Sequence, residues 1–192
     1  MRDVEPVPEG IARGLFARGL LLVVSDDLRA SAAPPPPEGV VIEPFIGHDW
    51  ARLATIADEA ERRRFRVRAS VGRTCLVAWE RGRPLGYAWV SPAAEVAVEG
   101  LRLELPLGAC FGWSLFVDPP ARSRGIGAAL AGARLLWAEA DGYTAMWRLI
   151  APDAALLLDA PPDIRDRSTL VGQLRFVRFL HWYRGALVPL AA

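Results

Sequence analysis

The sequence predicts a mixed α/β fold, and three observations support this. Short apolar runs typical of strands alternate with two stretches in which apolar residues recur at helical spacing. Hydrophobic residues make up 52% of the 192 residues and charged residues 23%, which provides for a sizeable core. Four consecutive prolines separate an N-terminal extension with a short strand, residues 1–39, from a single domain at residues 40–192.

The N-terminal extension contains one apolar run, residues 20–24, which predicts a short buried strand. Because four prolines fit neither a helix interior nor a sheet, residues 31–39 are predicted to be a stiff spacer. Residues 40–45 are typical of a strand. A helix that opens near residue 48 is predicted from three apolar residues at helical spacing: Leu53, Ile56 and Ala57.

The middle of the chain predicts a hairpin followed by a central strand. Residues 73–79 and 85–90 are typical of strands, and residues 81–83 form the tip between them. Residues 91–108 form a longer connection, with strand character around residues 101–105. Residues 110–117 make a strongly apolar strand that ends at a polar residue followed by two prolines.

The C-terminal part predicts one more helix and two β segments. Residues 123–140 have a helical pattern, with these residues on one face: Ile126, Ala129, Leu130, Ala133 and Trp137. Residues 144–150 predict a strand, and residues 170–182 a final strand or hairpin. The element order indicates a layered α/β arrangement.

The composition excludes several chemistries. All 23 basic residues are arginine, so no lysine can form a Schiff base or serve a P-loop. The chain also has no asparagine, which excludes a papain-like site and a glycan acceptor. A net charge of +1 argues against a dedicated nucleic-acid binder. No cluster of His, Cys, Asp and Glu has metal-ligand spacing, so we predict no metal site.

The two cysteines, Cys75 and Cys110, lie far apart in apolar stretches. They are read as two buried reduced thiols, with one disulfide as the alternative. The N-terminus has acids and prolines where a signal peptide needs an apolar region, and the longest apolar run near it is too short to span a bilayer. These observations predict a soluble cytoplasmic protein.

The segment that carries chemistry is residues 115–130, an apolar strand followed by a loop and a helix. The first amides of the helix are unpaired and, with the helix dipole, make an anion site. Gly125 and Gly127 let a ligand approach the backbone, and Arg122 and Arg124 add donors and positive charge. The segment therefore suits a phosphate or pyrophosphate.

Three phosphate cradles were compared with this segment. A P-loop needs a lysine, and a dinucleotide fingerprint needs a small residue where Leu130 stands. The third is the acyl-CoA loop. Arg122-x-x-Gly125-x-Gly127 resembles motif A of the GNAT superfamily of N-acyltransferases, whose signature is Gln/Arg-x-x-Gly-x-Gly/Ala. The resemblance extends over roughly residues 40–182.

The resemblance implies a mixed, mostly antiparallel central sheet flanked by helices. It implies acetyl-CoA or another acyl-CoA as co-substrate, and acyl transfer to an amine of a small molecule or peptide by direct attack on the thioester. The loop amides would bind the CoA pyrophosphate, and the last residues of the central strand would pair with the pantetheine arm where the sheet opens toward residues 144–150. The implied cofactor-binding residues are Phe116, Val117, Arg122, Ser123, Arg124, Gly125, Ile126, Gly127 and Ala128.

The chain departs from the family after residue 150. The family usually shows an Asn there, a helix with a Tyr as thiolate acid, and a Gly-Phe turn; here Asp153 stands where Asn is common, and no Tyr lies between Tyr143 and Tyr183. No catalytic residue is therefore assigned. Glu104 is a candidate base or a solvated loop residue, and Tyr183 would reach the site only by an unusual path.

Other sequence features leave alternatives open. His48, at a helix start, and His181, in an aromatic strand, are read as a surface residue and a packed residue, with catalysis as the alternative. The arginine run at residues 62–68 is a solvated helix face, a nucleic-acid surface, or the border of an acceptor pocket that attracts an anionic group.

The domain itself is an enzyme or a catalytically weak GNAT-like module that binds acyl-CoA or a protein partner. Residues 1–30 are a candidate for docking on a second subunit, which would make a homodimer. Neither a nucleic acid nor a membrane is expected as a partner.

Overall fold

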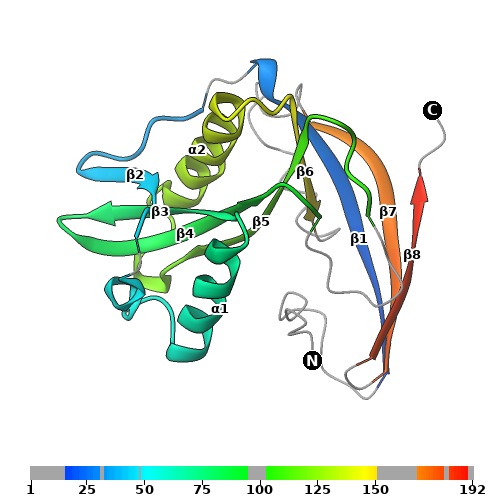
Figure 1. Ribbon diagram of the computed structural model, residues 1–192, viewed down its shortest axis with the longest axis horizontal. Coiled ribbons are helices and arrows are strands. Elements are labelled where there is room, and N and C mark those ends of the chain that lie inside the picture. Colours follow the sequence, from blue (N-terminus) through cyan, green and yellow to red (C-terminus); the bar gives the residue numbers. More distant parts are fainter. Residues whose placement is uncertain are drawn as a thin grey trace.

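The computed structural model describes residues 16–30, 33–47, 49–94, 103–150, 168–179 and 182–189. In this part of the chain, eight strands form one sheet in the order β2-β3-β4-β5-β6-β1-β7-β8, and two α-helices cover it (Figure 1). The strands are β1 (Phe16–Asp27), β2 (Val40–Pro44), β3 (Thr74–Glu80), β4 (Arg83–Ser91), β5 (Ala109–Val117), β6 (Ala145–Ile150), β7 (Ser168–Phe179) and β8 (Trp182–Pro189), and the helices are α1 (Glu59–Ser70) and α2 (Ile126–Ala140).

The sheet is antiparallel except between β5 and β6, which run parallel. The predicted mixed, mostly antiparallel fold is therefore confirmed. The predicted hairpin is β3–β4, whose tip has Arg81 and Gly82 at φ +49° and +77°. Positive φ at both central residues is typical of the two-residue turn that fits twisted strands. The predicted C-terminal β segment is the hairpin β7–β8. Residues 103–105, where strand character was expected, are in no regular structure.

Strand β1 is longer and more central than the sequence predicts. It has 12 residues and is paired on both sides, with β6 and with β7. The apolar run predicts only residues 20–24, because Asp26 reads as a strand end. Asp26 instead continues the strand, since its buried carboxylate accepts hydrogen bonds from Arg148 of β6. The boundary at residue 39 stays a prediction, but the sheet itself runs across it.

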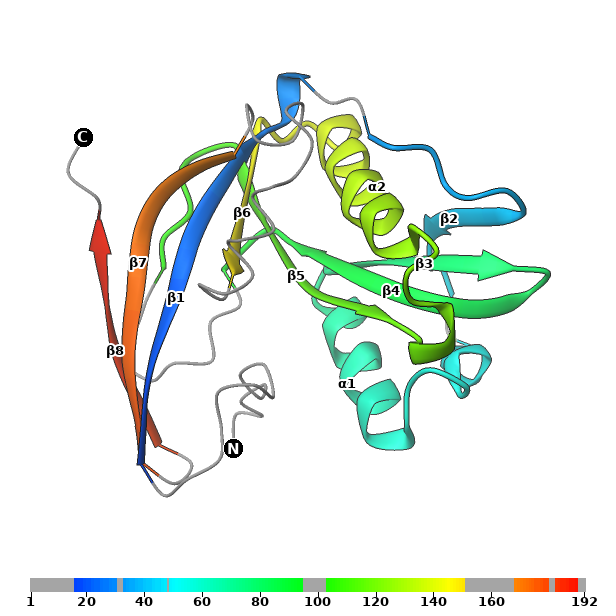
Figure 2. The same cartoon turned by 180° about the vertical axis from the view of Figure 1, so that it is seen from behind.

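The two helices lie on opposite faces of the sheet, α1 over β3–β5 and α2 near β4–β6 (Figure 2). The predicted helix start near residue 48 is wrong, since residues 50–53 form only a short 3-10 turn. Helix α1 starts at Glu59 because the carboxylate of Asp58 accepts a hydrogen bond from the Glu61 amide at 2.7 Å. An Asp followed three residues later by Glu is a capping pattern that the apolar spacing does not reveal.

An aromatic cluster fills the space between α1 and the sheet. It includes Trp50, Phe65 and Trp89, which are at most 2% exposed. Arg68 of α1 lies in the same cluster, with its guanidinium 4.5 Å from the ring centroid of Trp113. The other arginines of the 62–68 run form ion pairs with Glu59 and Glu61 of their own helix. The run is therefore a self-paired helix face with one buried member.

The proline spacer packs against helix α2. A Cβ added at Gly132 would lie 2.6 Å from the Ala33 Cβ and 3.0 Å from the Pro34 Cδ. Such distances leave no room for a side chain, so Gly132 lets the spacer lie directly on the helix. The end of the spacer, at Pro37, lies 3.8 Å from the position of a Cβ at Gly125.

Cys75 and Cys110 are free and buried, so the reading as reduced thiols is confirmed. Burial raises the pKa of both thiols, which makes them poor nucleophiles. In the described ranges, no helix is both long and apolar enough to cross a membrane.

Candidate functional site

The sheet opens between β5 and β6. Three residue pairs join the two strands, from Ala109↔Ala145 to Phe111↔Trp147. Beyond them, β5 stays paired with β4 alone and β6 with β1 alone, and the two strands diverge (Figure 2). The last five residues of β5, residues 113–117, are half-buried or exposed. The opening expected between these strands is therefore present.

A β-bulge shapes the edge of β5 at this opening. Trp89 pairs with Trp113 and Tyr87 with Phe116, so β5 holds one extra residue. Ser114, at φ +47°, marks the bulge. Neither Ser114 nor Leu115 has a register partner on β4. The bulge thus lies on the stretch of β5 that has no register partner on β6.

The loop after β5 presents a row of amides without backbone partners. In the part of the chain that the structure describes, no amide from residue 123 to residue 128 donates to a carbonyl, and the first bond of the helix is Ala129 N to Gly125 O at 3.0 Å. Ser123 and Gly125 have φ +61° and +80°. Left-handed residues in such a turn gather successive amides into a concave anion site. The positive dipole end of α2 adds to it.

The two glycines of the loop, Gly125 and Gly127, differ in backbone conformation. Gly125, the N-cap of α2, has a left-handed backbone that a side chain would strain. Gly127 has no such backbone, and a Cβ there would make an ordinary 3.6 Å contact with Val117 Cγ2. Packing within the described chain therefore does not require a glycine at residue 127.

Several predicted binding residues are already engaged by the protein. Ile126 is 1% exposed and belongs to the core, so only its amide can face a ligand. Arg122 Nε donates to the Val117 carbonyl at 3.2 Å, so this arginine is held against the end of β5. Arg124 forms a two-pronged ion pair with Glu80 at the end of β3.

The tip of the β3–β4 hairpin thus contacts the loop through an exposed ion pair. The Arg124 guanidinium lowers the pKa of Glu80, because its hydrogen bonds favour the charged carboxylate. A second bridge, 3.0 Å long, joins Arg83 to Asp118 at the end of β5. The predicted loop residues lie together beside this hairpin tip, and their amides have no backbone partner: Ser123, Gly125, Gly127 and Ala128.

Of the candidate catalytic residues, Glu104 alone is described with its side chain. Glu104 is exposed and precedes the start of β5, whereas the loop follows its end. His48, Asp153 and His181 lie outside the described residues. Tyr183 is in β8, at the far side of the sheet order, and only its backbone is described. Catalytic residues therefore stay unassigned.

Sequence reasoning missed a buried polar group beside the opening. Arg134 of α2 and Asp26 of β1 are 6% and 4% exposed. Arg134 stands four residues after Leu130, in line with the buried face of the helix, and only this spacing could have revealed it. Arg148 and Ser168 both donate to Asp26.

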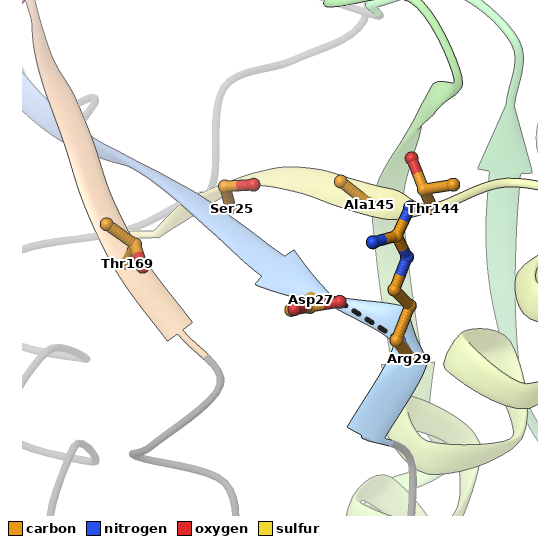
Figure 3. A pocket seen from close by; sticks show the side chains of 6 residues that line it. All are labelled: Ser25, Asp27, Arg29, Thr144, Ala145 and Thr169. Atoms are coloured by element: carbon orange, nitrogen blue, oxygen red, sulfur yellow. Dashed lines mark hydrogen bonds between the residues drawn. The ribbon is translucent and has the colours of Figure 1, made fainter.

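A separate hollow of about 360 Å³ lies at the other end of the sheet (Figure 3). Its lining is polar and comprises Ser25, Asp27, Arg29, Thr144, Ala145 and Thr169. Because Asp27 and Asp26 are adjacent on a strand, their side chains point to opposite faces of the sheet. Thr144 precedes the start of β6, so the hollow is remote from the loop. Within the described part of the chain, no cluster of potential metal ligands occurs.

Comparison with known proteins agrees with this geometry. The family model described as "Acetyltransferase (GNAT) family" matches residues 44–156. A GCN5-related N-acetyltransferase from Sphaerobacter thermophilus has a TM-score of 0.56 and 15% identity, over 90% of this chain and 53% of that chain. A tandem GNAT protein from the clavulanic acid biosynthesis pathway has a TM-score of 0.56 and 16% identity, over 91% and 55%.

A third similar structure is a GCN5-related glucosamine N-acetyltransferase region of a fungal multi-domain GH3 β-N-acetylglucosaminidase. It has a TM-score of 0.59 and 14% identity, over 82% of this chain and 20% of that chain. The chain thus spans about half the length, or less, of these three solved chains. No curated protein matches it by sequence.

The solved structures share the fold at low identity, and the family model covers more than half of the 192 residues. The matched range contains the opened β5–β6 pair and the loop of unpaired amides. On this basis, the chain belongs to the GNAT acetyltransferase family.

Proposed function

We propose that the protein is an acyl-CoA-dependent N-acyltransferase, acting on an amine of a small molecule or peptide. The observation that supports this most is the row of unpaired amides from residue 123 to residue 128, at the end of a strand that has lost its neighbour. A pyrophosphate offers several anionic oxygens, which such a row can bind together.

The opening between β5 and β6 suits the rest of the cofactor. A pantetheine arm is extended and carries amide groups, so it can pair with a strand edge. The stretch of β5 after Phe111, which has no register partner on β6 and contains the bulge at Ser114 and Leu115, presents that edge. Phe116 and Val117 continue this edge, and the Val117 carbonyl also accepts a hydrogen bond from Arg122.

The chemical step is transfer of the acyl group from sulfur to nitrogen. The amine nitrogen forms a bond to the thioester carbonyl carbon, the carbon–sulfur bond breaks, and the thiolate leaves. A base takes the amine proton and an acid protonates the thiolate. The unpaired loop amides and the open edge of β5 support the cofactor-binding part of this proposal.

Two measurements test the proposal. Isothermal titration with acetyl-CoA and with CoA is expected to show binding by the full chain. A thiol-release assay across a panel of amines is expected to show turnover. Binding without turnover on any amine would favour the alternative, a GNAT-like acyl-CoA-binding module. Absence of binding to every acyl-CoA would reject both.

A further inference from the structure

Arg134 is a charged residue on the buried face of helix α2. Residues 126, 130, 134 and 138 follow each other at four-residue spacing, and all four are buried. The other three are Ile126, Leu130 and Ala138, which pack in apolar clusters. A guanidinium in such a row is costly to bury unless something pairs with it.

The guanidinium lies where β5 and β6 separate. A Cβ added at Gly112 would come within 2.9 Å of the Arg134 Cζ and 3.0 Å of its Nε. Gly112 is the first residue of β5 after the last parallel pair, Phe111↔Trp147. The absence of a side chain at Gly112 therefore lets the guanidinium lie against the backbone at the apex of the opening.

Among the described residues, this charge has no carboxylate to itself. Asp26 is the carboxylate whose charge acts on Arg134, but Arg148 binds it at 2.6 and 3.0 Å and the Ser168 hydroxyl donates to it at 2.5 Å. In the described part of the chain, Arg134 Nε has no hydrogen-bond partner. Burial, with repulsion from Arg148, lowers the pKa of Arg134 to about 10, so it is still charged at neutral pH. The guanidiniums of Arg134 and Arg148 thus share the carboxylate of Asp26.

A cofactor arm that starts at the loop and follows the open edge of β5 would run toward this charge. From the loop, an arm that follows the unpaired edge of β5 passes the bulge and then reaches Gly112. Val117 and Gly112 are five residues apart, roughly 16 Å along a strand, which is comparable with an extended pantetheine arm. An acyl group that continues past the sulfur in the same direction meets Arg134.

We propose that Arg134 binds a carboxylate at the far end of the acyl group, so that the preferred donor is the CoA thioester of a dicarboxylic acid, such as succinyl-CoA. The proposal rests on the proposed function and names its donor class. A guanidinium binds a carboxylate through two parallel hydrogen bonds, and the apolar surroundings strengthen them. Acetyl-CoA carries no group that fills this role.

The test compares three donors on the full chain by isothermal titration: succinyl-CoA, butyryl-CoA and acetyl-CoA. Butyryl-CoA has the same four-carbon length as the succinyl group and no carboxylate. We expect succinyl-CoA to bind about ten-fold or more tightly than butyryl-CoA, in line with a charged hydrogen-bond pair. Equal affinities in the wild-type protein would overturn the proposal.

The matched variant is Arg134→Met, which fills the same row with an apolar side chain. It is expected to remove the preference for succinyl-CoA, keep the affinity for acetyl-CoA, and raise the melting temperature, because an unpaired buried charge is gone. Arg134→Lys keeps the charge and is expected to keep part of the preference. Arg63→Met, at an exposed arginine of α1, is the control and should change neither property.

Two further outcomes distinguish failure of the donor assignment from failure of the proposed function. If acetyl-CoA and succinyl-CoA bind alike and Arg134→Met weakens only a carboxylate-bearing amine acceptor in the turnover assay, the carboxylate belongs to the acceptor and the donor assignment is wrong. If no CoA thioester binds, the proposed function fails as well. Binding of acetyl-CoA together with equal donor affinities would leave the function standing and overturn this inference alone.

Discussion

The guanidinium of Arg124 is held by the carboxylate of Glu80, on the hairpin tip beside the loop. The sequence offers Arg124 as a free phosphate ligand, yet its charge is already paired. A CoA phosphate that binds Arg124 would therefore compete with the Glu80 carboxylate for the N–H groups of the guanidinium. The pair is an exposed one, so it is easily exchanged.

Glu80→Gln is expected to strengthen CoA binding by about two- to five-fold, because Arg124 then faces the phosphate alone. Arg124→Gln is expected to weaken binding by a similar factor. Isothermal titration at low salt measures both. If Glu80→Gln weakens binding, the pair serves to position the loop and Arg124 is not a phosphate ligand.

The Glu80–Arg124 ion pair is expected to make the affinity for CoA depend on pH. The pKa of Glu80 is lowered in the folded protein, so its bridge is intact above the unfolded value of 4.5 and is lost as pH falls through the folded value. We expect the affinities of wild type and Glu80→Gln for CoA to converge below pH 4.5 and to differ at neutral pH. A constant difference across the titration would contradict the role given to Glu80.

Gly127→Ala separates ligand binding from folding. The site has room for a Cβ and an ordinary backbone, and alanine favours helix, so unfolding free energy should stay equal or rise by up to about 1 kcal/mol. The methyl group would lie in the path of the ligand, and CoA affinity should fall about ten-fold. Urea unfolding and isothermal titration check the two effects. Unchanged affinity would mean that the ligand does not approach this glycine.

Gly132→Ala is the matched contrast in the same helix. Its Cβ would meet Ala33 and Pro34 of the spacer at 2.6 and 3.0 Å, so the spacer must move. We expect a loss of about 1–3 kcal/mol in unfolding free energy, despite the better helix propensity of alanine. Urea unfolding is the measurement. A gain in stability would show that the spacer does not rest on α2 in solution.

Arg148→Met is expected to destabilise the fold by about 3–5 kcal/mol, because it leaves the buried carboxylate of Asp26 without its main partner. The double variant Arg148→Met with Asp26→Leu should recover part of the loss, since the buried carboxylate and its main partner are removed together, while Arg134 loses the attraction of Asp26. Urea unfolding of the full cycle gives the coupling. Purely additive effects would mean that the two residues act independently.

Removing residues 1–27 takes a strand out of the middle of the sheet. The truncated chain is expected to lose its cooperative urea transition, because β6 and β7 each lose a paired neighbour. Light scattering should show association, since unpaired strand edges attract other chains. A truncated protein with an unchanged transition midpoint and mass would contradict the central position of β1.

The loop was predictable because its signal is local. Arg122, Gly125 and Gly127 lie within six residues, directly between a strand and a helix, and each backbone role follows from chain geometry. The opening next to it was implied by the family resemblance. It depends on where the pairing of β5 and β6 stops, after Phe111 and Trp147, and no residue pattern within either strand marks that point.

The position of β1 and the burial of Arg134 were not predictable, because both depend on contacts far along the chain. A strand's neighbours are set by residues far along the chain, such as Arg148, which reverses the meaning of Asp26 from strand end to buried partner. Arg134 occupies a core position that apolar periodicity assigns to Leu or Ala. The predicted helix face used Ala133 and Trp137 instead, which are only half-buried.

The place of β1 also sets an order of events for folding. Asp26 and Arg148 are 122 residues apart, and β7 comes later still. During synthesis the first strand therefore emerges long before either of its neighbours, and its apolar residues must wait for both. Such long-range pairing slows folding. We infer that closure of the sheet around β1 is a late step, and that a chaperone acting on the nascent chain would protect this strand first.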